Sequence, residues 1–187
     1  YDGYLYKTTD GGSTWELNFS IPFAFGTGDV AFTDHDRGWF LARNQIAGTT
    51  DGGTSWQVQR SGQFSRISPL DSARAIVAGE SGQIFRTDDG GIGWQSINPA
   101  SPANFQKVFF ADSLVGFVTT GLELLKSTDG GRSFDALTQS HVSSIFFTDR
   151  TRGWIGRDLT GGWSMISRTT DGGATWTDQT AELPHST

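Results

Sequence analysis

Five aspartates, each followed by two glycines, are the residues of this sequence whose types and spacing could do chemistry. Successive copies are separated by 41, 38, 40 and 42 residues. Aspartates in glycine-rich turns can ligate calcium, but a calcium loop needs several oxygen ligands that converge. A neighbouring acid occurs only in the third copy, at Asp88. The pattern therefore indicates structural turns, and we expect neither a metal ion nor another cofactor. The repeated aspartates are Asp10, Asp51, Asp89, Asp129 and Asp171.

Each Asp-Gly-Gly stretch predicts a β-hairpin turn. Glycine accepts positive φ without a steric penalty, and a short carboxylate can accept hydrogen bonds from the N–H groups of the turn. A Ser or Thr two residues before each aspartate can add a hydroxyl bond. An aromatic residue follows each aspartate by five places and could fold back over the turn. Because these aromatics recur with the repeat, we expect turn lids or core residues. They are Trp15, Trp56, Trp94, Phe134 and Trp176.

Residues suited to catalysis are few and scattered. A glycosidase of the two-carboxylate type needs two opposed acids at a set separation, whereas most aspartates here occupy repeated positions. The three histidines lack the spacing of a metal site. The sequence contains no Ser-His-Asp arrangement, phosphate loop or nucleotide motif. We therefore predict that the chain is not an enzyme. Four aspartates outside the repeated positions remain as free candidates, without distinguishing context: Asp29, Asp36, Asp158 and Asp178.

Charge and composition exclude further classes of function. The 187 residues carry a net charge of −6, which argues against a nucleic-acid binder and against adsorption to anionic lipid. No apolar run approaches the length of a membrane-spanning helix, so we expect no insertion into a membrane. Cysteine is absent. A secreted protein whose signal has been removed would have this composition, as would a cytosolic one. The start at Tyr1 without an initiating Met suggests a processed or truncated product, so we predict a periplasmic, lumenal or secreted location.

The elements that must hold these turns are short β-strands at regular spacing, and no stretch has a helical period. A β-propeller arranges such repeats radially, with one four-stranded sheet for each repeat. We therefore predict an all-β propeller of four-stranded antiparallel blades, with about four and a half blades in one domain. The half blade is expected at 1–20 and the complete blades at 28–60, 63–98, 104–138 and 141–180.

Two motifs carry a family resemblance. The pattern Ser/Thr-x-Asp-x-Gly-x-Thr/Ser-Trp resembles the Asp-box, or BNR repeat, of sialidases, sortilin-type receptors, xyloglucan-cleaving glycosidases and photosystem II assembly factors. A second pattern, an apolar strand followed by Asp, three residues and Gly-aromatic, precedes most copies, as in Val30–Trp39 and Ile145–Trp154. The pair is most similar to the photosystem II assembly factor-like propellers. The resemblance implies that the box joins the third and fourth strands of a blade without catalytic duty, and that photosynthetic members bind an assembling reaction-centre protein.

The same topology predicts where a partner would bind. The turns between the second and third strands share a face with the links between blades, and propellers generally bind partners there. Aromatics that break the repeat suit protein or glycan recognition. The polar candidates are Arg43, Asn44, Gln45, Glu80, Arg157 and Asp158; the aromatic candidates are Phe23, Phe25 and Trp163.

Three functions fit these observations. The first is a non-catalytic scaffold that presents its loops to a protein partner. The second is a secreted carbohydrate-binding or glycoside-hydrolysing propeller. The third is a structural repeat module of a larger surface assembly. Four and a half blades leave an open edge, which predicts either a fragment of a propeller with six or seven blades or completion between chains, as in a homo-oligomer.

Overall fold

The computed structural model describes residues 3–21, 28–42, 45–98, 101–158 and 164–179. All the regular elements in these ranges are strands, grouped into four four-stranded sheets and one two-stranded sheet. Each four-stranded sheet has its strands in chain order and antiparallel. The predicted all-β fold with four-stranded antiparallel blades is confirmed. The described residues include no helix long and apolar enough to cross a membrane.

The two-stranded sheet comes first in the chain, and the four-stranded sheets follow one after another. The first contains β1 (Gly3–Lys7) and β2 (Glu16–Ile21). The next two contain β3 (Asp29–Phe32), β4 (Gly38–Ala42), β5 (Gln45–Thr49) and β6 (Gln57–Ser61), then β7 (Phe64–Pro69), β8 (Ala75–Gly79), β9 (Ile84–Thr87) and β10 (Gln95–Ile97). The last two contain β11 (Lys107–Phe110), β12 (Gly116–Thr119), β13 (Leu124–Ser127) and β14 (Asp135–Ala136), then β15 (Val142–Phe147), β16 (Gly153–Asp158), β17 (Ser164–Thr169) and β18 (Thr177–Gln179).

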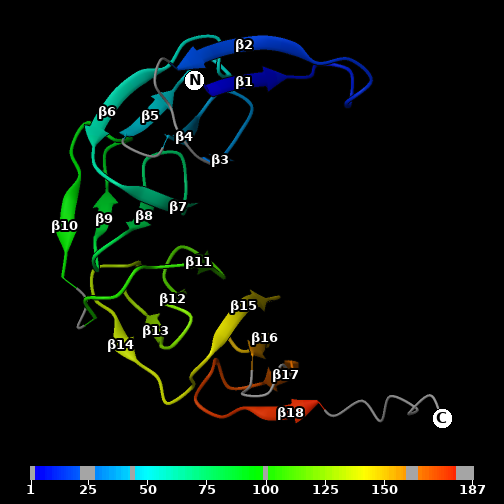
Figure 1. Ribbon diagram of the computed structural model, residues 1–187, viewed down its shortest axis with the longest axis vertical. Helices are drawn as coiled ribbons and strands as arrows, with labels where there is room; N and C mark the ends of the chain where they lie inside the picture. Colours follow the sequence, from blue (N-terminus) through cyan, green and yellow to red (C-terminus); the bar gives the residue numbers. More distant parts are fainter. Residues whose placement is uncertain (1–2, 22–27, 43–44, 99–100, 159–163, 180–187) are drawn as a thin grey trace.

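The sheets succeed one another along an arc, with β1–β2 at one end and β15–β18 at the other (Figure 1). The middle strands β8, β9 and β12 are buried along their whole length, whereas the outer strands β14 and β18 are exposed. Short apolar runs between turn signals are typical of strands with both faces covered. Three apolar clusters fill the spaces between consecutive four-stranded sheets, so the core lies between blades and is not a single centre.

A side-chain hydrogen bond crosses each of the four junctions between the described sheets. At three junctions the donor is the residue that immediately precedes the Ser or Thr of one sheet's Asp-Gly-Gly turn. Its side chain donates to the carbonyl of the first glycine in the Asp-Gly-Gly turn of the following sheet. Lys7 reaches Gly52 over 2.6 Å, Arg86 reaches Gly130 over 2.8 Å, and Lys126 reaches Gly172 over 2.6 Å. At the remaining junction the donor comes from another strand, since Gln59 Nε2 bonds the Gly90 carbonyl over 2.9 Å. We call this contact the interblade latch.

The division of the chain into one propeller domain, with a half blade at 1–20 and complete blades at the predicted boundaries, stays a prediction. The observed sheets define where the strands lie. They do not define the extent of the domain to which the sheets belong.

Candidate functional site

Carboxylates organise the five Asp-Gly-Gly turns. In the first turn the Thr8 hydroxyl donates to Asp10 Oδ1 over 2.8 Å and accepts from the Gly12 N–H over 2.8 Å. Thr14 donates to the same carboxylate from its N–H over 2.9 Å and from its hydroxyl over 2.7 Å. The turns at Asp51, Asp129 and Asp171 repeat this set of bonds. The paired glycines of all five turns have φ between 67° and 95°, which only glycine adopts freely.

The hydrogen bonds in the turns lower the pKa values of the carboxyl groups. The Thr14 N–H and hydroxyl lower the pKa of Asp10 to about 2. The Ser55 hydroxyl lowers that of Asp51 to about 2, and the Thr175 hydroxyl does the same for Asp171. Burial raises the pKa of Asp129, but hydrogen bonds led by the Ser133 hydroxyl outweigh it and bring the value to about 2. The pKa of Asp89 is also lowered, chiefly by the Gly93 N–H.

A second set of turns, at Asp34, Asp71, Asp112 and Asp149, uses carboxylates in the same way. Asp34 Oδ1 accepts the N–H groups of Asp36 and Arg37, both over 2.8 Å. In the four four-stranded sheets, the first glycine of the Asp-Gly-Gly turn donates to a carbonyl in this neighbouring turn, as Gly52 does to Asp36 over 2.8 Å. The two kinds of turn therefore lie at the same end of each sheet. Their aspartates are ionised, hydrogen-bonded supports for backbone, which is the opposite of what a general acid requires. Among the described residues, no group of three or more His, Asp or Glu side chains could hold a metal ion.

The aromatic residues of the repeat are not equally buried. Trp56 and Phe134 are buried, Trp94 and Trp176 are half-buried, and Trp176 Nε1 donates to the Gly173 carbonyl over 3.1 Å. Trp15, which we expected as a lid or core residue, is 61% exposed. The difference follows from its neighbours, because the Trp56 ring packs edge-on against Phe32 and Phe40. Trp15 has no such aromatic pair in the part of the chain that the structure describes.

Four of the predicted partner-binding residues lie within the described ranges. Gln45 is half-buried at the start of β5, and Glu80 is exposed in a turn where the Ser81 N–H bonds Asn104 Oδ1 over 2.7 Å. Arg157 forms an ion pair with Asp178 over 2.6 Å inside its own sheet, beside exposed Asp158. No hydrogen bond or ion pair between described residues joins the candidates of different sheets. Arg43, Asn44, Phe23, Phe25 and Trp163 lie outside the described residues.

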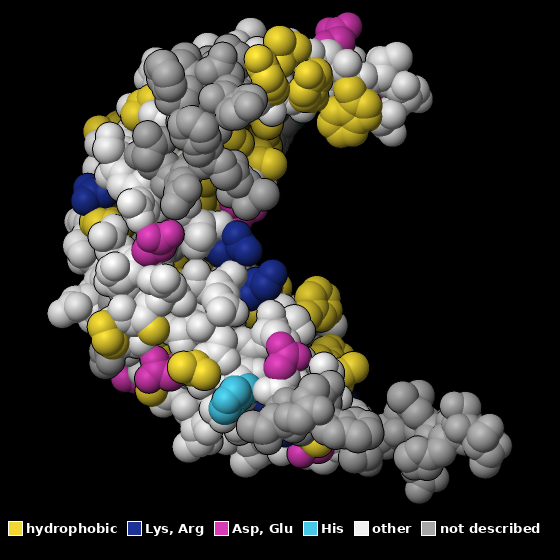
Figure 2. Space-filling view, viewed as in Figure 1, with side chains coloured by type: hydrophobic (Ala, Val, Ile, Leu, Met, Phe, Trp, Pro, Cys, Tyr) yellow, Lys and Arg dark blue, Asp and Glu magenta, His cyan; other side chains and the backbone are white. Residues whose placement is uncertain are grey.

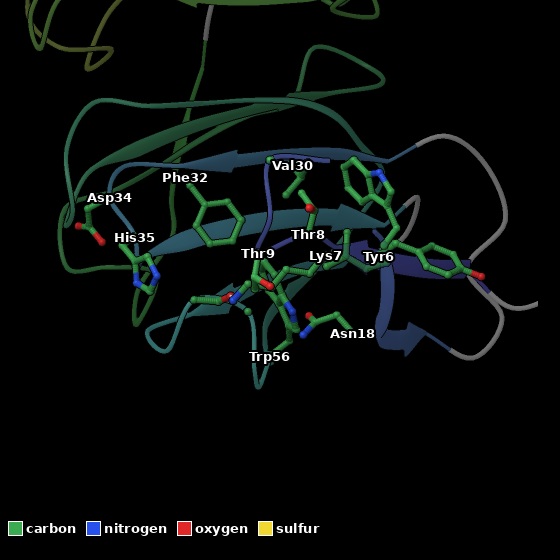
Figure 3. A pocket seen from close by; sticks show the side chains of 15 residues that line it. Tyr6, Lys7, Thr8, Thr9, Asn18, Val30, Phe32, Asp34, His35 and Trp56 are labelled. Atoms are coloured by element: carbon green, nitrogen blue, oxygen red, sulfur yellow. The ribbon is translucent and has the colours of Figure 1, made fainter. Parts of the chain in front are cut away.

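An open hollow lies elsewhere, between the β1–β2 sheet and the β3–β6 sheet (Figure 3). It is an open pocket of about 640 Å³. Aromatic and aliphatic side chains dominate its walls, and Thr8 and Thr9 also line it. Phe32 and Val30, which line it from β3, are 42% and 47% exposed. The main lining residues are Leu5, Tyr6, Lys7, Trp15, Val30, Phe32, His35 and Trp56.

A comparison between junctions explains this pocket. In β11, Val108 and Phe110 occupy the positions of Val30 and Phe32, and they pack against a cluster that includes Ile76 and Ala78 of β8. That strand, β8, lies on the inner side of β9 in its sheet. At the junction between the β1–β2 sheet and the β3–β6 sheet, a strand equivalent to β8 would pair with β1. Among the described residues, β1 has β2 as its only ladder partner. Within the described ranges, the pocket therefore lies beside the outer edge of the β1–β2 ladder.

Sequence reasoning did not find this pocket, since it nominated loops on the opposite face. One signal was available, because all three tyrosines fall within the first six residues. Where the first sheet has Leu5-Tyr6, the corresponding strands have Ile46-Ala47 and Ile84-Phe85. Large amphipathic rings at a position that is otherwise buried indicate a surface that meets something other than the usual neighbouring blade.

Known proteins share this arrangement of sheets. No family model matches the chain. The structure of YCF48 bound to D1 peptide covers 97% of this chain and 78% of its own, at 20% identity and a TM-score of 0.65. YCF48 from Cyanidioschyzon merolae covers 94% of this chain and 63% of its own, at 18% identity and a TM-score of 0.70.

The fold is that of the Ycf48 propellers. A curated relative, the photosystem II assembly lipoprotein Ycf48 of Parasynechococcus marenigrum (strain WH8102), is 39% identical over 72 residues. The match covers 38% of this chain and 20% of the relative, so it spans about a fifth of that protein's length. The resemblance to the photosystem II assembly factor-like propellers is thereby confirmed. An ancestral GH74 enzyme also matches, at 17% identity and a TM-score of 0.79, over 95% of this chain and 28% of its own. At that identity the likeness shows the shared fold alone.

Proposed function

We propose that this chain is a non-catalytic assembly scaffold of the photosystem II assembly factor-like type, and that it binds an extended segment of a partner protein. The observation that carries the proposal is the apolar pocket beside β1, a strand whose ladder partner among the described residues is β2 alone. Backbone groups on a sheet edge bind an added strand through main-chain hydrogen bonds, and pockets beside the edge select its side chains.

The geometry specifies the chemistry of the bound segment. Val30 and Phe32 offer an apolar wall like the one that Val108 and Phe110 offer to β8. That strand has the sequence Ala-Ile-Val-Ala-Gly. A segment of small and aliphatic residues in extended conformation would fit the same space. The exposed Tyr6 and Trp15 add large aromatic surfaces to the same pocket, and aromatic side chains contribute strongly to recognition.

The comparisons support a protein partner. One structural neighbour is YCF48 with a D1 peptide bound, and the curated relative is named as a photosystem II assembly lipoprotein. The relative's name also supports an extracytoplasmic location. The turn carboxylates support the absence of catalysis, since hydrogen bonds hold their pKa values low and keep them ionised. Carbohydrate binding or hydrolysis, suggested by the GH74 neighbours, has the fold alone in its favour.

Binding of a D1 peptide tests the proposal. We expect saturable binding by calorimetry, with an affinity that Phe32→Ser weakens about tenfold, because a side chain that packs on the peptide is lost. Val58→Ser is the matched control, since Val58 is 60% exposed on β6 and does not line the pocket. A peptide with proline at alternate positions should not bind, because proline cannot donate to a strand ladder.

Two results would contradict the proposal. One is no measurable binding at millimolar peptide, and the other is binding that Phe32→Ser leaves unchanged. Hydrolysis of a xyloglucan oligosaccharide by the purified chain would favour the enzyme alternative instead.

A further inference from the structure

The four-stranded sheets each present their first strand to the concave side of the arc (Figure 1). These inner strands are β3, β7, β11 and β15, and each is an edge strand of its sheet. One position near the start of the inner strand changes its charge from sheet to sheet. It lies opposite the fourth residue of the neighbouring strand in all four sheets. The residues that hold it are Asp29, Arg66, Lys107 and Ser144.

Asp29 shows what a carboxylate does at this position. Its Oδ2 accepts the N–H of Ile67 in the following sheet over 3.1 Å. That N–H points away from β8, because the Leu70 N–H, three residues further on, donates to the Arg74 carbonyl that leads into β8. Successive N–H groups along a strand point to opposite sides. The Asp29 carboxylate therefore satisfies a backbone donor that β8 leaves free at the concave edge.

The same backbone donor recurs in the next two sheets. Val108 in β11 and Ile145 in β15 have the register of Ile67, since each lies opposite the third residue of the neighbouring strand. The Ala111 and Thr148 N–H groups, three residues further on, donate to the carbonyls that lead into β12 and β16, over 2.9 and 3.0 Å. By the same alternation, the N–H groups of Val108 and Ile145 point to the concave edge.

Cations stand beside these two donors, where the preceding junction has a carboxylate. Arg66 is half-buried and Lys107 is exposed, and no ion pair between described residues involves either of them. Arg66 Nη1 donates to the Ser65 carbonyl over 2.6 Å, which uses one of its five N–H groups. Figure 2 shows Lys and Arg side chains on the concave edge near the middle of the arc. A cation beside a free N–H is a pair of donors suited to an anionic acceptor.

The two donor pairs belong to junctions that are complete in the described chain. The β7–β10 sheet packs against the β3–β6 sheet on one side and the β11–β14 sheet on the other, and the β11–β14 sheet also packs against the β15–β18 sheet. The position of Arg66 and Lys107 is therefore set by neighbours inside the arc and not by the ends of the chain.

We infer that the concave edge from β7 to β15 binds carboxylate groups, which take at Arg66 and Lys107 the place that the Asp29 carboxylate takes at the preceding junction. Two donor pairs at consecutive junctions suit a ligand with two carboxylates, either a small dicarboxylate or an acidic segment of a protein. This inference does not rest on the proposed function, because neither Arg66 nor Lys107 lines the pocket between β1 and β3.

Titration of the full ¹⁵N-labelled chain with succinate, up to about 50 mM, tests the site. We expect saturable shifts of the Val108 and Ile145 amide resonances. Arg66→Gln should weaken the effect at Val108 about tenfold, and Lys107→Gln that at Ile145, because a charge-assisted hydrogen bond becomes a neutral one. Arg37→Gln is the matched control, since Arg37 is exposed in the β3–β4 turn, at the other end of the sheet.

Arg66→Asp tests the equivalence with Asp29. Its carboxylate should accept the Val108 N–H, slow hydrogen exchange of that amide about fivefold and abolish the effect of succinate there. The Ile67 amide, which already has an internal carboxylate, is the reference within the same protein. Phe32→Ser, which alters the pocket of the proposed function, should leave the response to succinate unchanged.

A peptide with glutamate at alternate positions, compared with the same peptide carrying glutamine, separates the two sources of carboxylate. Shifts caused by the glutamate peptide alone of the two indicate an acidic protein segment, and shifts caused only by succinate indicate a small dicarboxylate. Either result supports the site. The inference is overturned if neither ligand shifts the two amides, if both glutamine variants leave the shifts unchanged, or if Arg66→Asp leaves exchange at Val108 as fast as in the wild type.

Discussion

Gln59 occupies the space that a side chain at Gly48 would need. A Cβ built on Gly48 would lie 2.2 Å from Gln59 Nε2, and that nitrogen donates to the Gly90 carbonyl over 2.9 Å. Gly48 holds the latch position that Lys7, Arg86 and Lys126 hold in other sheets. The bond between sheets is thus kept while its donor has moved from β5 to the neighbouring strand β6. The two residues act as one unit.

This coupling predicts a non-additive double substitution. Gln59→Ala should destabilise the protein by about 1 kcal/mol, since the Gly90 carbonyl loses its donor. Gly48→Lys alone should cost about 1–3 kcal/mol, because the new side chain overlaps Gln59. The double variant should lose less than the sum, since lysine then fills the latch as Lys126 does at its own junction. Urea unfolding of the four proteins measures the coupling, and additive losses would show that the two positions are independent.

The latches should differ in strength with their burial. Arg86 is 1% exposed, bonds Gly130 and forms an ion pair with Asp88, whereas Lys126 is half-buried. We expect Arg86→Ala to destabilise the protein by about 3 kcal/mol, because the buried Gly130 carbonyl loses its donor and the packing around the guanidinium is lost. Lys126→Ala should cost about 1 kcal/mol. Arg86→Lys, which keeps a donor, should fall between wild type and Arg86→Ala. Equal losses for the two alanine variants would contradict this order.

The Asp-Gly-Gly turn at Asp89 lacks a hydroxyl hydrogen bond that the other four turns have, and adding it should stabilise the protein. Ser55, Ser133 and Thr175 donate to their turn aspartates over 2.6, 2.7 and 2.5 Å, whereas Gly93 holds this position beside Asp89. Gly93→Ser should raise the unfolding midpoint by about 2–4 °C, because it adds a hydrogen bond and restricts the unfolded chain. Ser133→Gly is the reverse control and should lower the midpoint by a similar amount. Calorimetry of both variants checks the prediction, which fails if the two shifts have the same sign.

Stability should fall steeply in acid. The pKa values of Asp10, Asp51, Asp129, Asp149 and Asp171 are about 2 in the folded chain. An unfolded aspartate has a pKa of about 3.9, so the unfolded chain binds protons first as the pH falls. The contribution of these groups is therefore complete above about pH 4 and is lost between about pH 4 and pH 2. Urea midpoints at a series of pH values test this. Asp171→Asn should be less stable at neutral pH and should reduce the slope in acid.

The repeat was readable from sequence because its information is local. Each turn places its hydroxyl, carboxylate, glycines and aromatic within eight consecutive residues, as in Thr8–Trp15, and the bonds that they form span at most a few positions. The strands between the turns follow from the same short period. The all-β fold with four-stranded blades was therefore determined by the sequence alone.

The pocket and the interblade latches were decided only by tertiary structure. Gln59 bonds Gly90, 31 residues away, and Lys7 bonds Gly52, 45 residues away, so no local pattern marks either pair. Trp15 and Trp56 have the same place in the repeat, yet one is 61% exposed and the other 9%. A repeat gives each blade the same local signals, but exposure depends on which neighbour packs against a blade. The neighbour of each blade is set by the tertiary arrangement of the sheets. The repeat sequence therefore does not show which surfaces are exposed for binding.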